Sequence, residues 1–83
     1  MNSPIGNSVS NRQTIQTAAD LGDIARRQRQ LLGLKQADLA GMAHTGNRFI
    51  VDLERGKPTL QLQMALDVLH LLGLEVTVRP RPL

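Results

Sequence analysis

The stretch from Lys35 to Lys57 limits the possible folds most, because its pattern predicts two short helices with only a tight turn between them. The first helix is expected over residues 36–43 and the second over residues 47–55. Residues 44–46, His-Thr-Gly, form the predicted turn. Gly46 is the position expected to adopt backbone angles that other residues resist, because glycine has no Cβ. The rest of the chain must therefore pack around this pair of helices.

The second helix of the pair has an apolar face and a polar face. Ile50 and Leu53 are expected to point into the core. The outward residues are Asn47, Arg48, Val51 and Asp52. Gly56 is expected to end the helix in a left-handed conformation, and Pro58 prevents the helix from resuming. Two short helices joined in this way form the helix-turn-helix of DNA-binding proteins, although a plain helical hairpin in a small bundle has the same outline.

The segment also resembles the helix-turn-helix of the phage-repressor-like regulators, the Xre or Cro/C1-type group. The shared positions are Leu34, Gln36, Leu39, Ala40, Ile50, Leu53, Glu54, Gly56 and Lys57. A narrower resemblance, through GNRFIVDLERGKPT and QMALDVLHLLGLEVTV, is to the HipB group, the antitoxins of kinase-type toxin–antitoxin pairs. It covers residues 20–79. The resemblance implies a lambda-repressor-like fold in which Glu54 makes a charge-assisted bond that locks the helix-turn-helix.

Composition predicts one small domain without a cofactor. The chain has 83 residues and no cysteine, which excludes disulfides and zinc–thiolate sites. Its single aromatic residue, Phe49, argues against reading single strands by stacking and is expected to lie in the core. There is no metal-ligand spacing and no catalytic motif, so neither a metal nor an enzymatic activity is predicted. Without a membrane-spanning run or a signal peptide, the expected location is cytoplasmic.

Basic residues concentrate on the segment that would face DNA. Residues 26–57 carry seven basic and three acidic residues, whereas the rest of the chain carries three basic and four acidic ones. An excess of this kind attracts a phosphate backbone, although a solvated helical face would show the same count.

The predicted domain, residues 17–73, follows a polar segment, residues 1–16, that is expected to be a flexible tail. A helix that precedes the pair, and is the first of the domain, should run from Thr17 or Asp20 to Leu32. The inner stripe of that helix is predicted to comprise Leu21, Ile24, Ala25, Leu31 and Leu32, with Arg26, Arg27 and Arg29 outside it.

The last helix is expected from Leu60 to Leu72, with Thr59 as its cap. It carries a main apolar stripe and a second, spare stripe that is made of Met64, Val68 and Leu71, which could either complete the core of this domain or face another subunit. The predicted fold class is therefore all-α, with four to five helices and one C-terminal strand.

Residues 74–83 are predicted to form a dimerisation strand and a short tail, because LEVTVR alternates apolar and polar residues. The chain offers no partner strand, so the same strand of a second copy is expected to pair with it across a two-fold axis. The HipB resemblance implies the same homodimer. The expected dimer contacts are Met64, Val68, Leu71, Leu74, Val76 and Val78. Alternatively, the strand docks on its own helices or becomes ordered only on another partner.

Contacts to DNA bases are predicted from the start of the second short helix. Arg48 suits guanine, Asn47 suits adenine, and Val51 suits a thymine methyl group. Asp52 could accept a hydrogen bond from cytosine, or could instead pair with Arg48 or Arg55. The phosphate contacts are assigned to Lys35, Gln36, Arg55 and Lys57. Gln36 begins a helix, where phosphate is favoured, and the resemblance implies that a glutamine here holds the DNA backbone.

The sequence thus predicts a repressor that binds a palindromic operator in double-stranded DNA. The HipB resemblance implies that it also regulates its own operon and binds a HipA-like serine/threonine kinase toxin. Two alternatives remain: a solitary Xre-family regulator without a toxin, and a protein-binding module that does not bind DNA.

Overall fold

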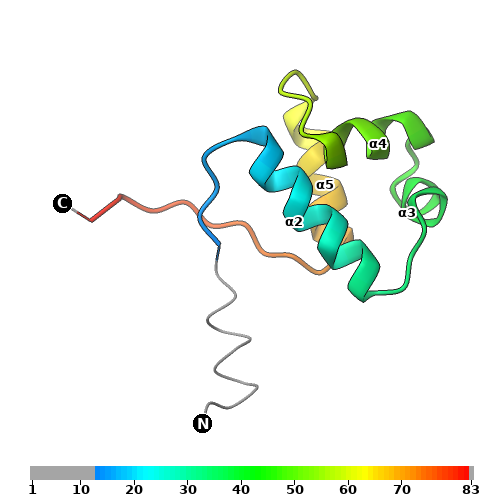
Figure 1. Cartoon of the computed structure of the whole chain (residues 1–83), viewed down its shortest axis with the longest axis horizontal. Helices are drawn as coiled ribbons and strands as arrows, with labels where there is room; N and C mark the ends of the chain where they lie inside the picture. The colour runs from blue at the N-terminus through cyan, green and yellow to red at the C-terminus, as the bar shows by residue number, and fades with distance from the viewer. Residues whose placement is uncertain (1–12, 83) are drawn as a thin grey trace, which may run out of the picture.

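The computed structural model describes residues 13–82, and the regular structure of this part consists of four helices (Figure 1). They are α2 (Ala18–Leu31), α3 (Gln36–Ala43), α4 (Asn47–Arg55) and α5 (Leu62–Leu71). Helix α4 packs against α2 and α3, and α3 also packs against α5. The predicted all-α fold is confirmed, and the bounds of α3 and α4 are those expected from the sequence. Most of residues 1–16, the predicted tail, lie outside the described residues.

Helix α2 begins with a capping box, which identifies Thr17 rather than Asp20 as the cap. The Asp20 N–H donates to the Thr17 hydroxyl at 3.0 Å, and the Thr17 N–H donates to the Asp20 carboxylate at 3.2 Å. Together these bonds satisfy two N–H groups that a bare helix end would leave without partners. The pKa of Asp20 lies below its ordinary value, mainly because its carboxylate accepts a hydrogen bond from the Gln16 N–H. The bond from the Thr17 N–H lowers the pKa further.

The inner face of α2 differs from the predicted stripe. Gly22 and Ala25 are buried, and the side chain of Arg29 is only 11% exposed. These three residues are three and four positions apart, so they share the face that meets α4. Leu31 lies two residues beyond Arg29, on roughly the opposite side, and is 82% exposed. The prediction that Leu31 and Leu32 lie inward and Arg29 outward was therefore wrong.

Two glycines let α2 and α4 approach each other backbone to backbone. A Cβ on Gly22 would lie 2.3 Å from the carbonyl oxygen of Leu53. A Cβ on Gly56, which follows α4 with a φ of 82°, would lie 2.5 Å from the Cα of Ala19. Any larger residue at either position would force the helices apart. Gly56 ends α4 in the left-handed conformation, as predicted.

The core is formed by nine buried apolar residues from all four helices and the first residue beyond α5. They are Ala25, Leu39, Ala40, Ile50, Leu53, Ala65, Val68, Leu69 and Leu72. Phe49 is partly buried and packs against this core, as expected. Val68, by contrast, was assigned to the dimer contacts and is fully buried here, so of the two alternatives for its stripe this residue follows the one that completes the core. The core of the single chain already uses its side chain.

Helix α5 starts at Leu62, two residues later than predicted, and its N-cap residue is Gln61 rather than Thr59. Residues 58–60 form a turn instead, from which Leu60 packs against the core. The helix ends at Leu71, and the last described residues lead away from the helices (Figure 1). Residues 74–82 have no regular secondary structure in this single chain, and no strand is formed within residues 13–82.

Candidate nucleic-acid interface

The first turn of α4 projects its polar side chains into solvent. Asn47 and Arg48 are exposed, whereas Ile50 and Leu53 on the other face of the helix are buried. Val51 is half-buried, one turn after Asn47. Helix α4 therefore presents the outward residues expected of a recognition helix at its N-terminal end, the end that reaches base edges in helix-turn-helix proteins.

The turn before α4 adopts a left-handed conformation at His44 and not at Gly46. His44 has φ 57° and ψ 39°, and Gly46 has φ −75° and ψ 158°, which any residue adopts. The prediction for Gly46 was therefore wrong. The left-handed residue lies directly after α3, where the N–H groups of His44 and Thr45 donate to carbonyls of the last helical turn. This is the usual place for a helix end of this type, although histidine has a Cβ and is strained there.

Asp52 lies between two basic residues that flank it in the sequence. One carboxylate oxygen is 3.2 Å from Nε of Arg48, and the other is 3.6 Å from Nζ of Lys57. The Asp52 side chain is 13% exposed, whereas that of Arg48 is 78% exposed. Of the alternatives for Asp52, the pairing with Arg48 is the one present in the structure, with Lys57 in place of Arg55 as the second cation.

Glu54 holds the helix-turn-helix against α2. Its carboxylate accepts two bonds from Arg29, at 2.6 and 3.0 Å, and one from the Gln36 amide at 3.1 Å. The same guanidinium donates to the carbonyl of Leu34 at 2.8 Å. The Glu54 side chain is 4% exposed, so these bonds form away from water, and the bond to Glu54 is the main cause that raises the pKa of Arg29. The structure places Glu54 in the charge-assisted bond that the resemblance implied.

Gln36 is the first residue of α3, as predicted for a residue that meets phosphate. Its Nε2 is engaged by Glu54, and its backbone N–H lies at the helix start, where no residue of the helix can accept its bond. Lys35 precedes it, and its N–H donates to the Asp38 carboxylate at 2.8 Å. The N-terminus of α3 thus combines an adjacent lysine with backbone N–H groups whose hydrogen bonds no residue of the helix can accept.

Some basic residues of the described chain are paired with carboxylates and others are not. Arg26 and Arg27 share the carboxylate of Asp23, at 2.6 and 2.9 Å, and the bond from Arg26 is the main cause that lowers the pKa of Asp23. Within residues 13–82, Lys35 and Arg55 form no ion pair. The same holds for Arg79 and Arg81 of the C-terminal segment, so the cations open to an external anion lie at α3, at the end of α4 and in that segment.

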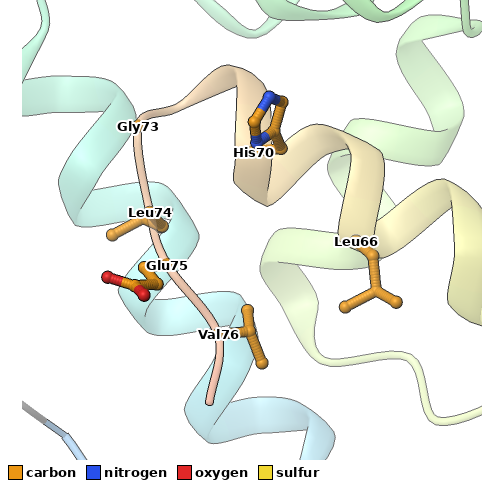
Figure 2. A pocket seen from close by; sticks show the side chains of 6 residues that line it. All are labelled: Leu66, His70, Gly73, Leu74, Glu75 and Val76. Carbon is orange, nitrogen blue, oxygen red and sulfur yellow. The ribbon is translucent and has the colours of Figure 1, made fainter.

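A groove lies between α5 and the chain that follows it (Figure 2). Its volume is about 480 Å³, and it is lined by Leu66, His70, Gly73, Leu74, Glu75 and Val76. Leu74 packs partly against the core, and Gln28 of α2 donates to the Leu72 carbonyl at 2.9 Å, which fixes the start of the segment.

The predicted dimer contacts beyond Leu74 are open to solvent: Val76 is 48% exposed and Val78 is 95% exposed. Of the predicted dimer stripe on α5, Met64 is half-buried and Leu71 is 38% exposed.

Neither a metal centre nor a membrane-spanning helix is present in the part of the chain that the structure covers. Within residues 13–82, no three acidic or histidine side chains come together in a way that could hold a metal ion. None of the four helices is long and apolar enough to cross a membrane.

Comparison with known proteins gives a relative in sequence and solved structures with a similar fold. The chain is 48% identical over 64 residues to y4mF of Sinorhizobium fredii (strain NBRC 101917 / NGR234), an uncharacterised HTH-type transcriptional regulator, covering 77% of this chain and 84% of the relative. A HipB variant in complex with an O2 20-mer has a TM-score of 0.79 at 24% identity and covers 87% of this chain and all of that one. A HipA–HipB–O2–O3 complex contains a chain with a TM-score of 0.78 at 22% identity, covering 86% of this chain and all of that one.

The family model described as helix-turn-helix, HTH_3, matches residues 26–78, which include α3, α4, α5 and the last part of α2. This is a family of DNA-binding transcriptional regulators rather than of enzymes. The chain therefore belongs to the HTH_3 family of phage-repressor-like helix-turn-helix transcriptional regulators.

Proposed function

We propose that this protein is a sequence-specific repressor that inserts α4 into the major groove of an operator. The observation that carries the proposal is the exposed N-terminal turn of α4, where Asn47 and Arg48 stand clear of the core. Arg48 would bond to guanine and Asn47 to adenine, and Val51 would contact a thymine methyl group. Asp52, the fourth predicted base reader, is largely buried and already paired with cations of its own chain.

Phosphate contacts would come from Lys35, Gln36, Arg55 and Lys57, which lie at the ends of α3 and α4. Lys35 and Arg55 have no ion-pair partner within residues 13–82. The backbone N–H of Gln36 would bind a phosphate oxygen at the start of α3 while Glu54 holds its side chain. Contacts of this kind fix the protein on the duplex but do not read the sequence.

The test is to compare two substitutions on the strongest-binding duplex that is selected from a random pool. Arg48→Ala should weaken binding to that duplex by about 1–3 kcal/mol and relax the preference at one base pair. Lys57→Ala should weaken all duplexes alike and reduce the slope of log affinity against log salt by about one. Arg26→Ala is the charge-matched control, because Arg26 lies on α2, outside the two helices to which the DNA contacts are assigned, and is paired with Asp23 of the same helix. Equal losses for all three variants on selected and random duplexes would refute base reading by α4. A parent protein that binds no duplex would instead favour the protein-binding alternative.

The proposed active form is a homodimer that is closed by the C-terminal segments. Residues 74–79 would pair as antiparallel strands from two copies, which would satisfy the backbone groups that have no ladder partner in the single chain. Leu71, Leu74, Val76 and Val78 would supply its apolar face, with Met64 beside them, whereas Val68 remains in the core. Such a dimer would present two α4 helices to half-sites about 34–36 Å apart, or a multiple of that spacing, on a pseudo-palindromic operator.

Sedimentation tests the dimer. A chain that ends at Gly73 should become monomeric and lose most operator affinity, because one α4 helix alone binds half a site. Val78→Asp should have the same effect, whereas Thr77→Asp is the matched control, because neighbouring residues of a strand face opposite sides. If the shortened chain remains dimeric, or if the two aspartate variants behave alike, this segment is not the subunit contact.

We further propose that the protein is an antitoxin of the HipB type, which represses its own operon and neutralises a HipA-like serine/threonine kinase. The support is the likeness in fold to HipB, including a chain solved together with HipA. Co-expression with the kinase from the adjacent reading frame should give a complex that elutes as one species and lacks kinase activity. A genome with no such kinase beside this gene would favour the solitary-regulator alternative, which agrees equally with the relative described only as a transcriptional regulator.

A further inference from the structure

Asp52 occupies an unusual position for a residue on the reading face of α4. Both carboxylate oxygens face cations of the same chain, one 3.2 Å from Nε of Arg48 and the other 3.6 Å from Nζ of Lys57. Its side chain is 13% exposed, so little of it is open to a base edge. A cytosine amino group would have to compete with two positive charges for these oxygens.

We propose that Asp52 is a positioning residue, which sets the edge of the Arg48 guanidinium that meets a guanine and reads no base itself. This inference rests on the proposed function above. An arginine can bond bidentately through either its Nε–Nη edge or its terminal Nη–Nη edge. Because the carboxylate lies against Nε, it leaves the terminal edge for the O6 and N7 atoms of guanine.

Local structure explains why one carboxylate reaches both cations. Arg48 and Asp52 are four residues apart on α4, so their side chains lie on the same face one turn apart. The left-handed backbone at Gly56 then turns the chain back, and the Lys57 N–H donates to the Asp52 carbonyl at 3.0 Å. The Lys57 side chain, at 52% exposed, thus returns to the carboxylate from beyond the helix end. Asp52 therefore links Arg48, the predicted base contact, to Lys57, the predicted phosphate contact.

The charge of Asp52 has a second effect that is opposite in sign. A carboxylate on the face that meets DNA repels phosphate, so it lowers affinity for every duplex irrespective of sequence. Removing the charge while keeping the shape, as in Asp52→Asn, should therefore strengthen binding to random DNA. The same change frees the Arg48 side chain to sample other rotamers, so discrimination at the base pair that Arg48 reads should fall. If Asp52 positions Arg48 and reads no base itself, affinity for random DNA should rise while discrimination falls at the base pair that Arg48 reads.

The experiment uses two duplexes: the strongest binder from a random pool, and the same duplex changed at the base pair whose preference Arg48→Ala relaxes. Asp52→Asn should reduce the affinity ratio between the two by about fivefold, the upper end of what an exposed ion pair contributes. Affinity for a random duplex should rise at the same time. Asp67→Asn is the matched control, because it makes the same chemical change on α5, where Asp67 contacts Gln63. In an Arg48→Ala background, Asp52→Asn should leave the ratio unchanged.

A readout without DNA checks the pairing itself. In the free protein, the Nε–H resonance of Arg48 should exchange with water faster in Asp52→Asn than in Asp67→Asn.

Several outcomes would overturn the inference. A loss of discrimination at a different base pair would mean that Asp52 reads a base, and a ratio that matches that of Asp67→Asn would mean that it positions nothing. If the parent protein shows no preference among duplexes, the proposed function itself fails and the inference falls with it. If the parent prefers the selected duplex and only the behaviour of Asp52→Asn disagrees, the inference alone fails.

Discussion

Substituting Gly22 by alanine should weaken the contact that places the recognition helix on the domain. Gly22 lies in the middle of α2, where alanine has the better helix propensity by about 1 kcal/mol. Propensity alone therefore predicts a more stable protein. Packing predicts the opposite, because the new methyl group would lie 2.3 Å from the Leu53 carbonyl oxygen and 2.9 Å from that of Glu54.

The size of the effect follows from these distances. To restore an ordinary separation of 3.4 Å from the Leu53 oxygen, α2 and α4 must move apart by about 1 Å. Overpacking in a core costs about 1–3 kcal/mol, and a clash with backbone lies at the upper end because no side-chain rotation relieves it. After subtraction of the gain in propensity, Gly22→Ala should destabilise the protein by about 2 kcal/mol.

Urea unfolding followed by far-UV circular dichroism measures this change, and Gly41→Ala provides the matched control. Gly41 is also helical, and a Cβ there would meet nothing within 4 Å. Its substitution should stabilise the protein by about 0.5–1 kcal/mol. If both variants are more stable than the parent, the two helices are not in backbone contact and the argument from close approach is refuted.

Three further predictions concern stability. Glu54→Gln should destabilise the fold by about 3 kcal/mol, because it leaves the largely buried Arg29 without its counter-charge; a loss under about 1 kcal/mol in urea unfolding would contradict a stabilising pair. His44→Gly should stabilise the protein by about 1 kcal/mol, because glycine adopts the left-handed conformation without strain, and an unchanged urea midpoint would argue against strain at this residue. The pKa of Asp20 is lower in the folded protein than its ordinary 3.8, so its stabilising effect is complete above that pH and disappears as the pH falls through the lower folded pKa. The stability difference between the parent and Asp20→Asn should therefore shrink in acid, and a difference that does not vary with pH would show that the charge of Asp20 is unimportant.

Local sequence signals predicted the two helices of the helix-turn-helix correctly, although the left-handed residue of the turn is His44 and not Gly46. The start of α3 at Gln36 and the end of α4 before Gly56 follow from apolar spacing and a glycine, which act over a few residues. The apolar face of α4 followed in the same way, because Ile50 and Leu53 share one side of a helix whatever it packs against. The outward direction of Asn47 and Arg48 followed from that face.

The side chains that the sequence placed on the wrong face depend on how separate helices dock. The inward face of α2 is set by Gly22 against Leu53 and by Arg29 against Glu54, and neither pairing leaves a signal in the spacing of apolar residues. Leu31 looks like a core residue until that docking rotates it into solvent. Val68 was misplaced for the same reason, because two apolar stripes on one helix do not reveal which of them meets the core.

The close approach at Gly56 also determines how this protein can adapt to a DNA duplex. Because the end of α4 rests on the backbone of Ala19 with no side chain between them, the helix cannot roll or slide without moving α2 as well. The recognition helix α4 and the rest of the domain should therefore dock on DNA as one rigid body. Adjustment to different operators then falls to long, exposed side chains such as Arg48 and to bending of the DNA itself. Base pairs that the protein never touches should consequently influence its affinity through their stiffness.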